Sequence, residues 1–204
     1  IRQCVFDTGF AELQGESRYT NLPAYLLGIV IERTSGKPID VLARDMFFDP
    51  LAMVHTSFCT ATHAAPTEIV DGVEIRDISH DESARACARE GLAVGHAGVF
   101  SSAGDLLTFF EALLAGEYPA VVRGATQGMG WSLNRPFFMG AHFGPRTFGK
   151  TGFTGTSVVC YIDRKVALVI LANRTYPKRP DDAASENSAM NIFRRSIADL
   201  VFQT

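Results

Sequence analysis

The 204-residue sequence has 47% hydrophobic and 20% charged residues, which suits a globular protein with one core or two small lobes. Its formal net charge is −3 and it has no basic patch, so a nucleic-acid partner is not expected. No uninterrupted apolar stretch reaches the roughly 18–20 residues that a membrane-spanning helix needs, so no membrane span is expected either.

Two helices are predicted near the start, followed by a long segment of different character. Apolar residues recur at helical spacing over residues 22–33, and Gly36 supplies a stop. Pro38 opens a second helix that ends before Asp49-Pro50. Residues 56–98 are rich in Thr, Ala, His and charge, and we interpret them as an excursion with a small hairpin near residues 70–75.

The second half predicts a helix, several strands and a closing helix. Ser102 is expected to cap a helix that Gly116 closes. The ranges predicted as strands are 128–133, 147–150, 157–163 and 166–173, the last two forming a hairpin, and a helical pattern covers 183–202. This order indicates an α+β fold with two regions. Residues 1–126 would be mainly helical, and residues 127–204 would supply the sheet strands and the C-terminal helix.

The cysteines and histidines suggest neither a disulfide framework nor a metal site. No two cysteines show Cys-x-x-Cys spacing, and Cys160 lies in an apolar run that favours burial. The five histidines never fall in a ligand-like pair, and each is expected at the surface or in a loop. We therefore expect no metal and no cofactor.

Tyr19 and Asn21 stand directly before the first predicted helix. At a helix start the positive end of the dipole favours a phenolate, and the Asn21 amide offers a donor and an acceptor to a substrate. A simpler interpretation is that Asn21 caps the helix and Tyr19 is a half-buried aromatic. From these residues alone the simpler interpretation is favoured.

A second candidate site covers residues 148–155, where Lys150 and Thr151 are followed by closely spaced glycines. At the end of a strand these residues would present an ammonium, a hydroxyl and free backbone N–H groups along an open edge. Such groups can bind a carboxylate and stabilise an oxyanion. The alternative is a glycine-rich turn with a solvated lysine, and the residues leave both open. Residues 95–102 suit either the lining of a cleft or a helix cap, and the cap explains them better.

Together these segments resemble the serine hydrolase family of class C β-lactamases, DD-peptidases and related esterases. Tyr19-Thr20-Asn21 and the helix after it resemble the family's Tyr-x-Asn element, and residues 48–53 resemble its Glu-Pro-Leu-Gly-Met segment. Lys150-Thr151-Gly152 matches the Lys-Thr-Gly strand motif of penicillin-binding enzymes. The resemblance implies a β-lactamase/transpeptidase-like fold, with an antiparallel sheet flanked by helices and a mainly helical region.

The resemblance also implies a role for each matching residue. Tyr19 would relay the proton of a serine nucleophile, and Asn21 would contact the amide side chain of the substrate. Lys150 and Thr151 would recognise a carboxylate, and the N–H of Phe153, after Gly152, would supply half of the oxyanion hole. The implied reaction is acyl transfer through an acyl-enzyme, on a small-molecule ester, amide or β-lactam.

The family's Ser-x-x-Lys nucleophile motif has no counterpart in this sequence, because no serine is followed by lysine three positions later. We expect the chain to be the C-terminal portion of such a hydrolase, with the nucleophile on a preceding segment or on a second chain. Such a fragment would expose sheet edge and core, which favours self-association. The alternative is a degenerate, non-catalytic relative that only binds ligands.

Overall fold

An antiparallel sheet forms the centre of one lobe in the computed structural model, which describes residues 19–181 and 185–203. Its strands in these residues are β5 (Ser132–Leu133), β6 (Thr147–Thr151), β7 (Ser157–Tyr161) and β8 (Val166–Ile170), in the order β5-β6-β7-β8. Phe148 pairs with Cys160, and Val159 pairs with Leu168. Successive side chains on β7 therefore point to opposite faces, and both faces need a cover.

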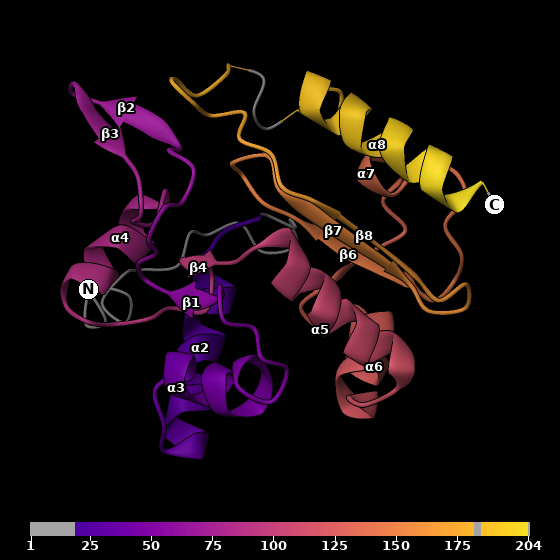
Figure 1. Ribbon diagram of the computed structural model, residues 1–204, viewed down its shortest axis with the longest axis horizontal. Helices are drawn as coiled ribbons and strands as arrows, with labels where there is room; N and C mark the ends of the chain where they lie inside the picture. Colours follow the sequence, from indigo (N-terminus) through magenta and orange to yellow (C-terminus); the bar gives the residue numbers. More distant parts are fainter. Residues whose placement is uncertain (1–18, 182–184, 204) are drawn as a thin grey trace, which may run out of the picture.

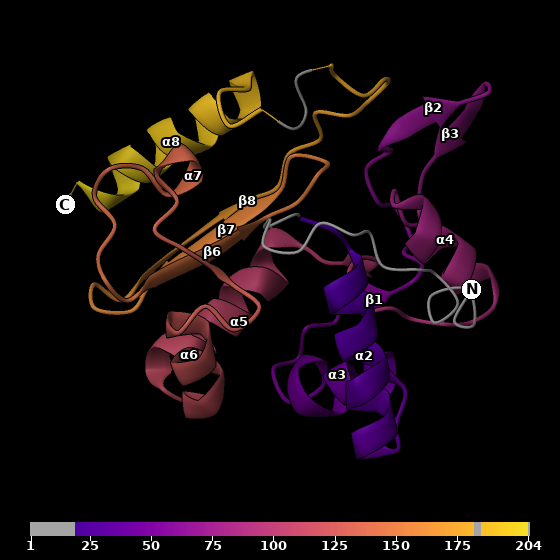
Figure 2. The same ribbon diagram turned by 180° about the vertical axis from the view of Figure 1, so that it is seen from behind.

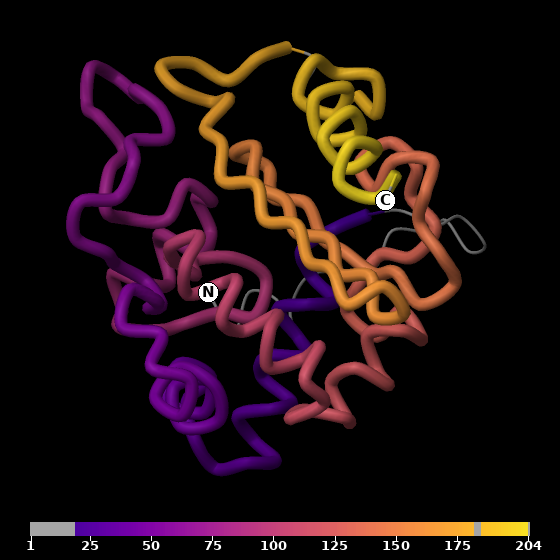
Figure 3. Tube along the Cα trace, turned by 45° about the vertical axis from the view of Figure 1, so that its right-hand side comes forward, coloured from indigo at the N-terminus to yellow at the C-terminus, as the bar shows by residue number. Residues whose placement is uncertain are grey.

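Helices cover both faces of this sheet (Figure 1). The four helices involved are α5 (Ala103–Ala115), α6 (Pro119–Thr126), α7 (Pro136–Met139) and α8 (Ala189–Phe202). On the face of α5 and α6 the core contains Phe110, Phe148 and Cys160. On the face of α7 and α8 it contains Val159 and Phe202. Figure 3 shows α8 running beside the strands in a turned view.

The second lobe, residues 19–100, is built mainly from helices. Its helices are α2 (Leu22–Ser35), α3 (Ile39–Ala43), the π-helical turn η1 (Arg44–Phe48) and α4 (Glu82–Arg89). Its strands form two antiparallel pairs: β1 (Ser57–Phe58) with β4 (Val99–Phe100), and the hairpin of β2 (Glu68–Val70) with β3 (Val73–Ile75). Its core joins Tyr25 and Ile29 of α2 to Cys87 of α4. Gly95 lies so close to α2 that a Cβ there would be 2.4 Å from the carbonyl oxygen of Ala24. Figure 2 shows α2 starting on the side that faces the sheet.

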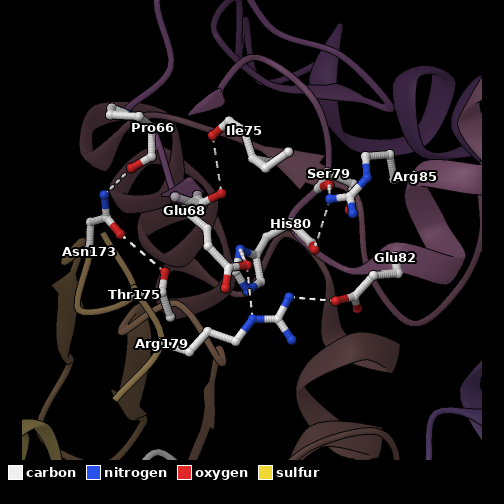
Figure 4. A network of polar contacts seen from close by, with 11 residues as sticks. Pro66, Glu68, Ile75, Ser79, His80, Glu82, Arg85, Asn173, Thr175 and Arg179 are labelled. Atoms are coloured by element: carbon white, nitrogen blue, oxygen red, sulfur yellow. Dashed lines mark hydrogen bonds and ion pairs between the residues drawn. The ribbon is translucent and has the colours of Figure 1, made fainter. Parts of the chain in front are cut away.

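The two lobes are joined by the segment that follows β8, residues 171–181, which we call the post-β8 segment. Arg179 Nε donates to Glu68 Oε2 at 2.9 Å, and the same guanidinium pairs with Glu82 (Figure 4). The amide of Ile69 donates to the carbonyl of Pro177 at 2.9 Å. These contacts hold β2 and α4 against the sheet lobe.

Most of the predicted elements are confirmed, including the helices at 22–33 and 103–114, the hairpin at 70–75, the strands from β6 to β8 and the closing helix. Three expectations change. Residues 56–98 hold α4 and the strand β1 as well as the hairpin, the strand predicted at 128–133 is reduced to β5, and the helix predicted from 183 begins at Ala189. The second helix passes into the π-helical η1, and α6 and α7 were not predicted.

Two further observations concern only residues 19–181 and 185–203. Within them, no helix is both long and apolar enough to span a membrane. No group of three or more His, Cys, Asp or Glu side chains in the same part of the chain could hold a metal ion.

Candidate functional site

Lys150 and Thr151 occupy the last two positions of β6 and pair with Val158 and Ser157 of β7. On the other side of β6, the ladder with β5 ends at Gly149. The pairing therefore leaves the β5 side of β6 open at Lys150 and Thr151 within the described residues. Lys150 lies on the same face of β6 as the buried Phe148, two positions further along, but its side chain is exposed.

A tight turn follows β6, and its glycines are required by close contacts. Gly152 N–H donates to the carbonyl of Thr156 at 2.8 Å, and Gly155 N–H donates to the carbonyl of Gly152 at 3.2 Å. A Cβ at Gly152 would lie 2.2 Å from Thr156 Oγ1. Gly155 has φ +117°, a conformation that side chains other than glycine's rarely adopt. The glycine pattern after Lys150 therefore has a local structural reason.

Phe153, the first residue inside this turn, lies where the two lobes meet. The guanidinium carbons of Arg174 and Arg179 are 5.5 and 5.7 Å from its ring centroid. The ring of His80 stacks on it at 5.7 Å and 26°. Arg174 Nε also donates to the Phe153 carbonyl at 2.9 Å. The turn is thus held from the post-β8 segment and from the helical lobe.

Tyr19 and Asn21 differ from the simpler interpretation of their sequence. Tyr19 is 86% exposed, so it is not a half-buried aromatic. Asn21 stands at the N-cap position of α2 but makes no side-chain capping bond. Its Nδ2 donates instead to Asp81 Oδ2 at 3.1 Å. The loop before α2 is therefore tied to the start of α4 in the excursion.

The second group of candidates is continuous along the chain, and no direct polar contact with the first group is seen among the described residues. Lys150, Thr151, Gly152 and Phe153 are consecutive along β6 and its turn. Within the described residues, no hydrogen bond or ion pair connects Tyr19 or Asn21 to any of these four. The grouping of all six into one site remains a prediction.

Asp81, Ser83 and His96 form a polar cluster beside Asn21 that the sequence did not reveal. Ser83 Oγ donates to Asp81 Oδ1 at 2.6 Å, and Asp81 Oδ1 accepts the Ala84 amide at 2.8 Å, which caps α4. His96 Nε2 lies 2.9 Å from Ser83 Oγ and 3.2 Å from Asp81 Oδ1. A Ser-His-Asp relay needs one ring nitrogen for each partner. Here a single nitrogen meets both, so the cluster is structural.

Burial and hydrogen bonding act in opposite directions on the Asp81 carboxyl. Burial would raise its pKa, whereas hydrogen bonds from Ser83, from the Ala84 amide and from His96 lower it, and the net pKa is lowered. Asp81 is thus held as a carboxylate that can accept from Asn21. An aspartate just before a run of helix-forming residues is an N-cap signal, and that signal could have located α4 from the sequence.

Comparison with known proteins decides the family. A family model described as Beta-lactamase matches residues 11–190. The chain belongs to the Beta-lactamase family. This membership confirms the family resemblance of the motifs, and the α+β fold with its antiparallel sheet agrees with it.

The curated relatives of this β-lactamase-family chain carry the name putative D-alanyl-D-alanine carboxypeptidase. One from Escherichia coli O157:H7 is 29% identical, over 83% of this chain and 48% of its own length. One from Salmonella newport (strain SL254) is 30% identical, over 78% of this chain and 45% of its own length. The chain therefore spans about half the length of the curated relatives it matches.

Solved structures support the same fold. A β-lactamase from Mycobacterium bovis has a TM-score of 0.58 at 20% identity, covering 91% of this chain and 63% of that one. EstCE1, a hydrolase with promiscuous acyltransferase activity, has a TM-score of 0.57 at 22% identity, covering 91% and 57%. The β-lactamase-like fold of the chain is thereby confirmed.

Proposed function

We propose that this chain supplies the Lys-Thr-Gly side of a serine acyl-hydrolase active site, acting on a small-molecule ester, amide or β-lactam through an acyl-enzyme. The observation that carries the proposal is the open side of β6 at Lys150 and Thr151, directly before a turn rigidly built on glycines. A substrate backbone can lie along an open strand edge and exchange hydrogen bonds with it.

The groups at this edge have the chemistry that the reaction needs. The exposed Lys150 ammonium and the Thr151 hydroxyl suit a substrate carboxylate, since charge-assisted hydrogen bonds are the strong ones. In acyl transfer, a tetrahedral oxyanion develops and needs preorganised donors. The N–H of Phe153 would be one of them. The lysine favours carboxylate-bearing substrates such as β-lactams or peptides.

Tyr19 would be the proton relay of this site. Its side chain is 86% exposed, so the hydroxyl is accessible to a substrate and to a nucleophilic serine. Asn21, oriented by Asp81, would contact the amide of the substrate. The serine attacks the acyl carbon, its proton passes to Tyr19, the leaving group departs with a proton, and water releases the acyl group.

Ligand binding without catalysis is the second candidate function. The observation that favours it is that no serine in these 204 residues is followed by lysine three positions later. A binding module of this kind would keep the Lys150 edge and form no covalent adduct with acylating reagents. The preparation's intact mass therefore discriminates the two functions.

The test is denaturing intact-mass spectrometry of the natural protein that contains this sequence, before and after exposure to a penicillin or a fluorophosphonate. The catalytic proposal expects a covalent adduct on the polypeptide that carries the nucleophile. Lys150→Ala and Tyr19→Phe should each slow acylation by about 100-fold or more, because a donor or a general base is lost. Exposed Lys37→Ala and Tyr176→Phe are the matched controls and should acylate at the parent rate.

Two results would contradict the catalytic proposal. Full acylation rates in both Lys150→Ala and Tyr19→Phe would remove these residues from the chemistry. Absence of any adduct on the natural protein that contains this sequence, with all of its polypeptides present, would favour ligand binding without catalysis.

A further inference from the structure

A buried guanidinium holds the turn that follows the Lys-Thr-Gly segment. Arg194, on α8, is only 3% exposed. Its Nη2 donates to the carbonyl of Thr156 at 2.7 Å and to the carbonyl of Gly152 at 3.1 Å, while its Nη1 donates to Asn191 Oδ1 at 2.7 Å. One side chain therefore bridges the two ends of the turn from the far side of the sheet lobe.

The burial of this charge is costly, which makes its placement informative. Burial lowers the pKa of Arg194 to about 10, and the nearby positive charge of Arg174 acts in the same direction. The guanidinium still carries its charge at neutral pH. A buried charge is tolerated where it is hydrogen-bonded. Here Nη1 and Nη2 donate to Asn191 and to two backbone carbonyls of one turn, while the buried Nε has no partner among the described residues.

The geometry of the peptide bond connects this contact to the candidate oxyanion donor. The carbonyl of Gly152 and the N–H of Phe153 belong to the same planar peptide unit, and in a trans unit they point in opposite directions. Arg194 occupies the carbonyl side, so the N–H points away from α8. Within residues 19–181 and 185–203, the Phe153 N–H has no acceptor.

We propose that Arg194 is a positioning residue that orients and polarises the Gly152–Phe153 peptide, so that the Phe153 N–H is a fixed and strengthened donor to an oxyanion. The inference rests on the proposed function for its catalytic consequence. Its physical basis is that hydrogen bonds in a chain polarise one another, and a charged donor does so more strongly than a neutral one.

The expected kinetic effect is smaller than the loss of an oxyanion donor. Removing such a donor lowers kcat by about 10²–10³-fold, while cooperative strengthening is about 10–30% per bond. Because Arg194 also fixes the orientation of the peptide, we expect Arg194→Met to lower kcat by about 10-fold. KM should change little, since the oxyanion exists only in the transition state and the tetrahedral intermediate.

The first experiment reads the peptide itself and needs no activity. The chain is labelled with carbonyl ¹³C-glycine and amide ¹⁵N-phenylalanine, which selects Gly-Phe pairs, and the sequence holds two of them, Gly9-Phe10 and Gly152-Phe153. A Phe153→Tyr variant assigns the resonance. The ¹⁵N resonance of Phe153 should move upfield in Arg194→Met, because its peptide carbonyl has lost a charged donor, while Arg195→Met leaves it in place.

The second experiment measures kcat and KM for hydrolysis by the natural protein with the same variants. A fall in kcat for Arg194→Met, together with the shifted resonance and normal Arg195→Met kinetics, supports the proposal. An unmoved Phe153 resonance in folded Arg194→Met overturns it. A shifted resonance with parent kcat also overturns the catalytic role, while leaving the acyl-hydrolase function intact.

The resonance separates this proposal from the function on which it rests. If the parent protein shows no acylation, the proposed function fails, and the resonance alone still decides whether Arg194 polarises the peptide. If Arg194→Met does not fold, the same two measurements are made on Arg194→Lys. It keeps the charge but lacks the planar fork that donates to Asn191 and to both carbonyls, so a partial shift and a partial fall in kcat are expected.

Discussion

Asn21 Nδ2 donates to Asp81 Oδ2 at 3.1 Å, and this bond joins residues 60 positions apart in the sequence. The other oxygen of the same carboxylate accepts the Ala84 amide and caps α4. The Asp81 side chain therefore caps the N-terminus of α4 and also holds the side-chain amide of Asn21. The bond uses one of the two hydrogens of Asn21 Nδ2 and leaves its carbonyl oxygen for the substrate contact that the proposed function assigns to it.

Two substitutions of Asp81 should separate its capping of α4 from its hydrogen bond to Asn21. Asp81→Ala removes both, and loss of an N-cap should lower the free energy of unfolding by about 1–2 kcal/mol. Asp81→Ser keeps a capping oxygen but is too short to hold Asn21, so it should recover most of the stability. Urea unfolding measures the first effect, and the side-chain amide resonances of Asn21 report the second. Equal losses in the two variants would show that the cap contributes little.

Gly152 should tolerate a methyl group only when its neighbour gives way. Gly152→Ala would place a Cβ 2.2 Å from Thr156 Oγ1, so the turn must open, and we expect a loss of about 1–3 kcal/mol. The contact is with a side-chain atom, so Thr156→Ala in the same chain should restore most of the stability.

Gly149 provides the matched comparison for this rescue. A Cβ at Gly149 would meet the backbone carbonyl of Val158 at 2.5 Å, which no side-chain change on β7 can relieve. Gly149→Ala should therefore remain destabilised when Val158 is shortened to alanine. Thermal unfolding of the two single and two double variants checks both expectations. Failure of Thr156→Ala to rescue Gly152→Ala would show that the glycine is needed for its backbone.

The structure shows why some parts of the fold were predictable from the sequence. Ser102 accepts the amide of Asp105, and Gly116 ends α5 in the left-handed conformation, as local cap rules require. The alternation along Ser157–Tyr161 places Val159 and Cys160 on opposite faces, as the pattern of a sheet covered on both sides predicts. These features depend on neighbours within a few residues.

The features that sequence reasoning missed depend on distant partners. His80 and His96 lie in loops, as expected, but their side chains are only 10% and 3% exposed, because α4 and the post-β8 segment pack around them. The contact of Arg194 with the turn spans 42 positions for Gly152 and 38 for Thr156. A polar helix such as α4 has no long apolar stripe to reveal it, and its packing is decided by the fold.

Asp105 should contribute to stability through a junction between the lobes. It is buried in the first turn of α5, and its Oδ2 accepts the His55 amide and Thr56 Oγ1, both at 2.8 Å. Asp105→Ala leaves a backbone donor without its acceptor, so we expect a loss of about 1–3 kcal/mol in urea unfolding. Glu111→Ala, at an exposed position of the same helix, should change stability by less than about 0.5 kcal/mol. Similar losses in the two variants would contradict a role for this carboxylate.

His80 should make stability depend on pH in the weakly acidic range. Its imidazole packs on Phe153 and lies 4.0 Å from Glu68. Burial lowers its pKa below 6.5, the charge of Arg179 adds to this and Arg85 contributes less, while Glu68 and Glu82 oppose it.

Because the folded pKa lies below the unfolded one, the unfolded chain binds more protons between the two values. The stability from neutral His80 should therefore be complete above about pH 6.5 and fall as the pH drops toward the folded pKa. His80→Gln removes this titration and should flatten urea-unfolding stability between about pH 5 and 7, whereas His142→Gln, at an exposed position, should keep the parent slope. Parallel slopes in all three proteins would mean that the buried imidazole is not the group that senses pH.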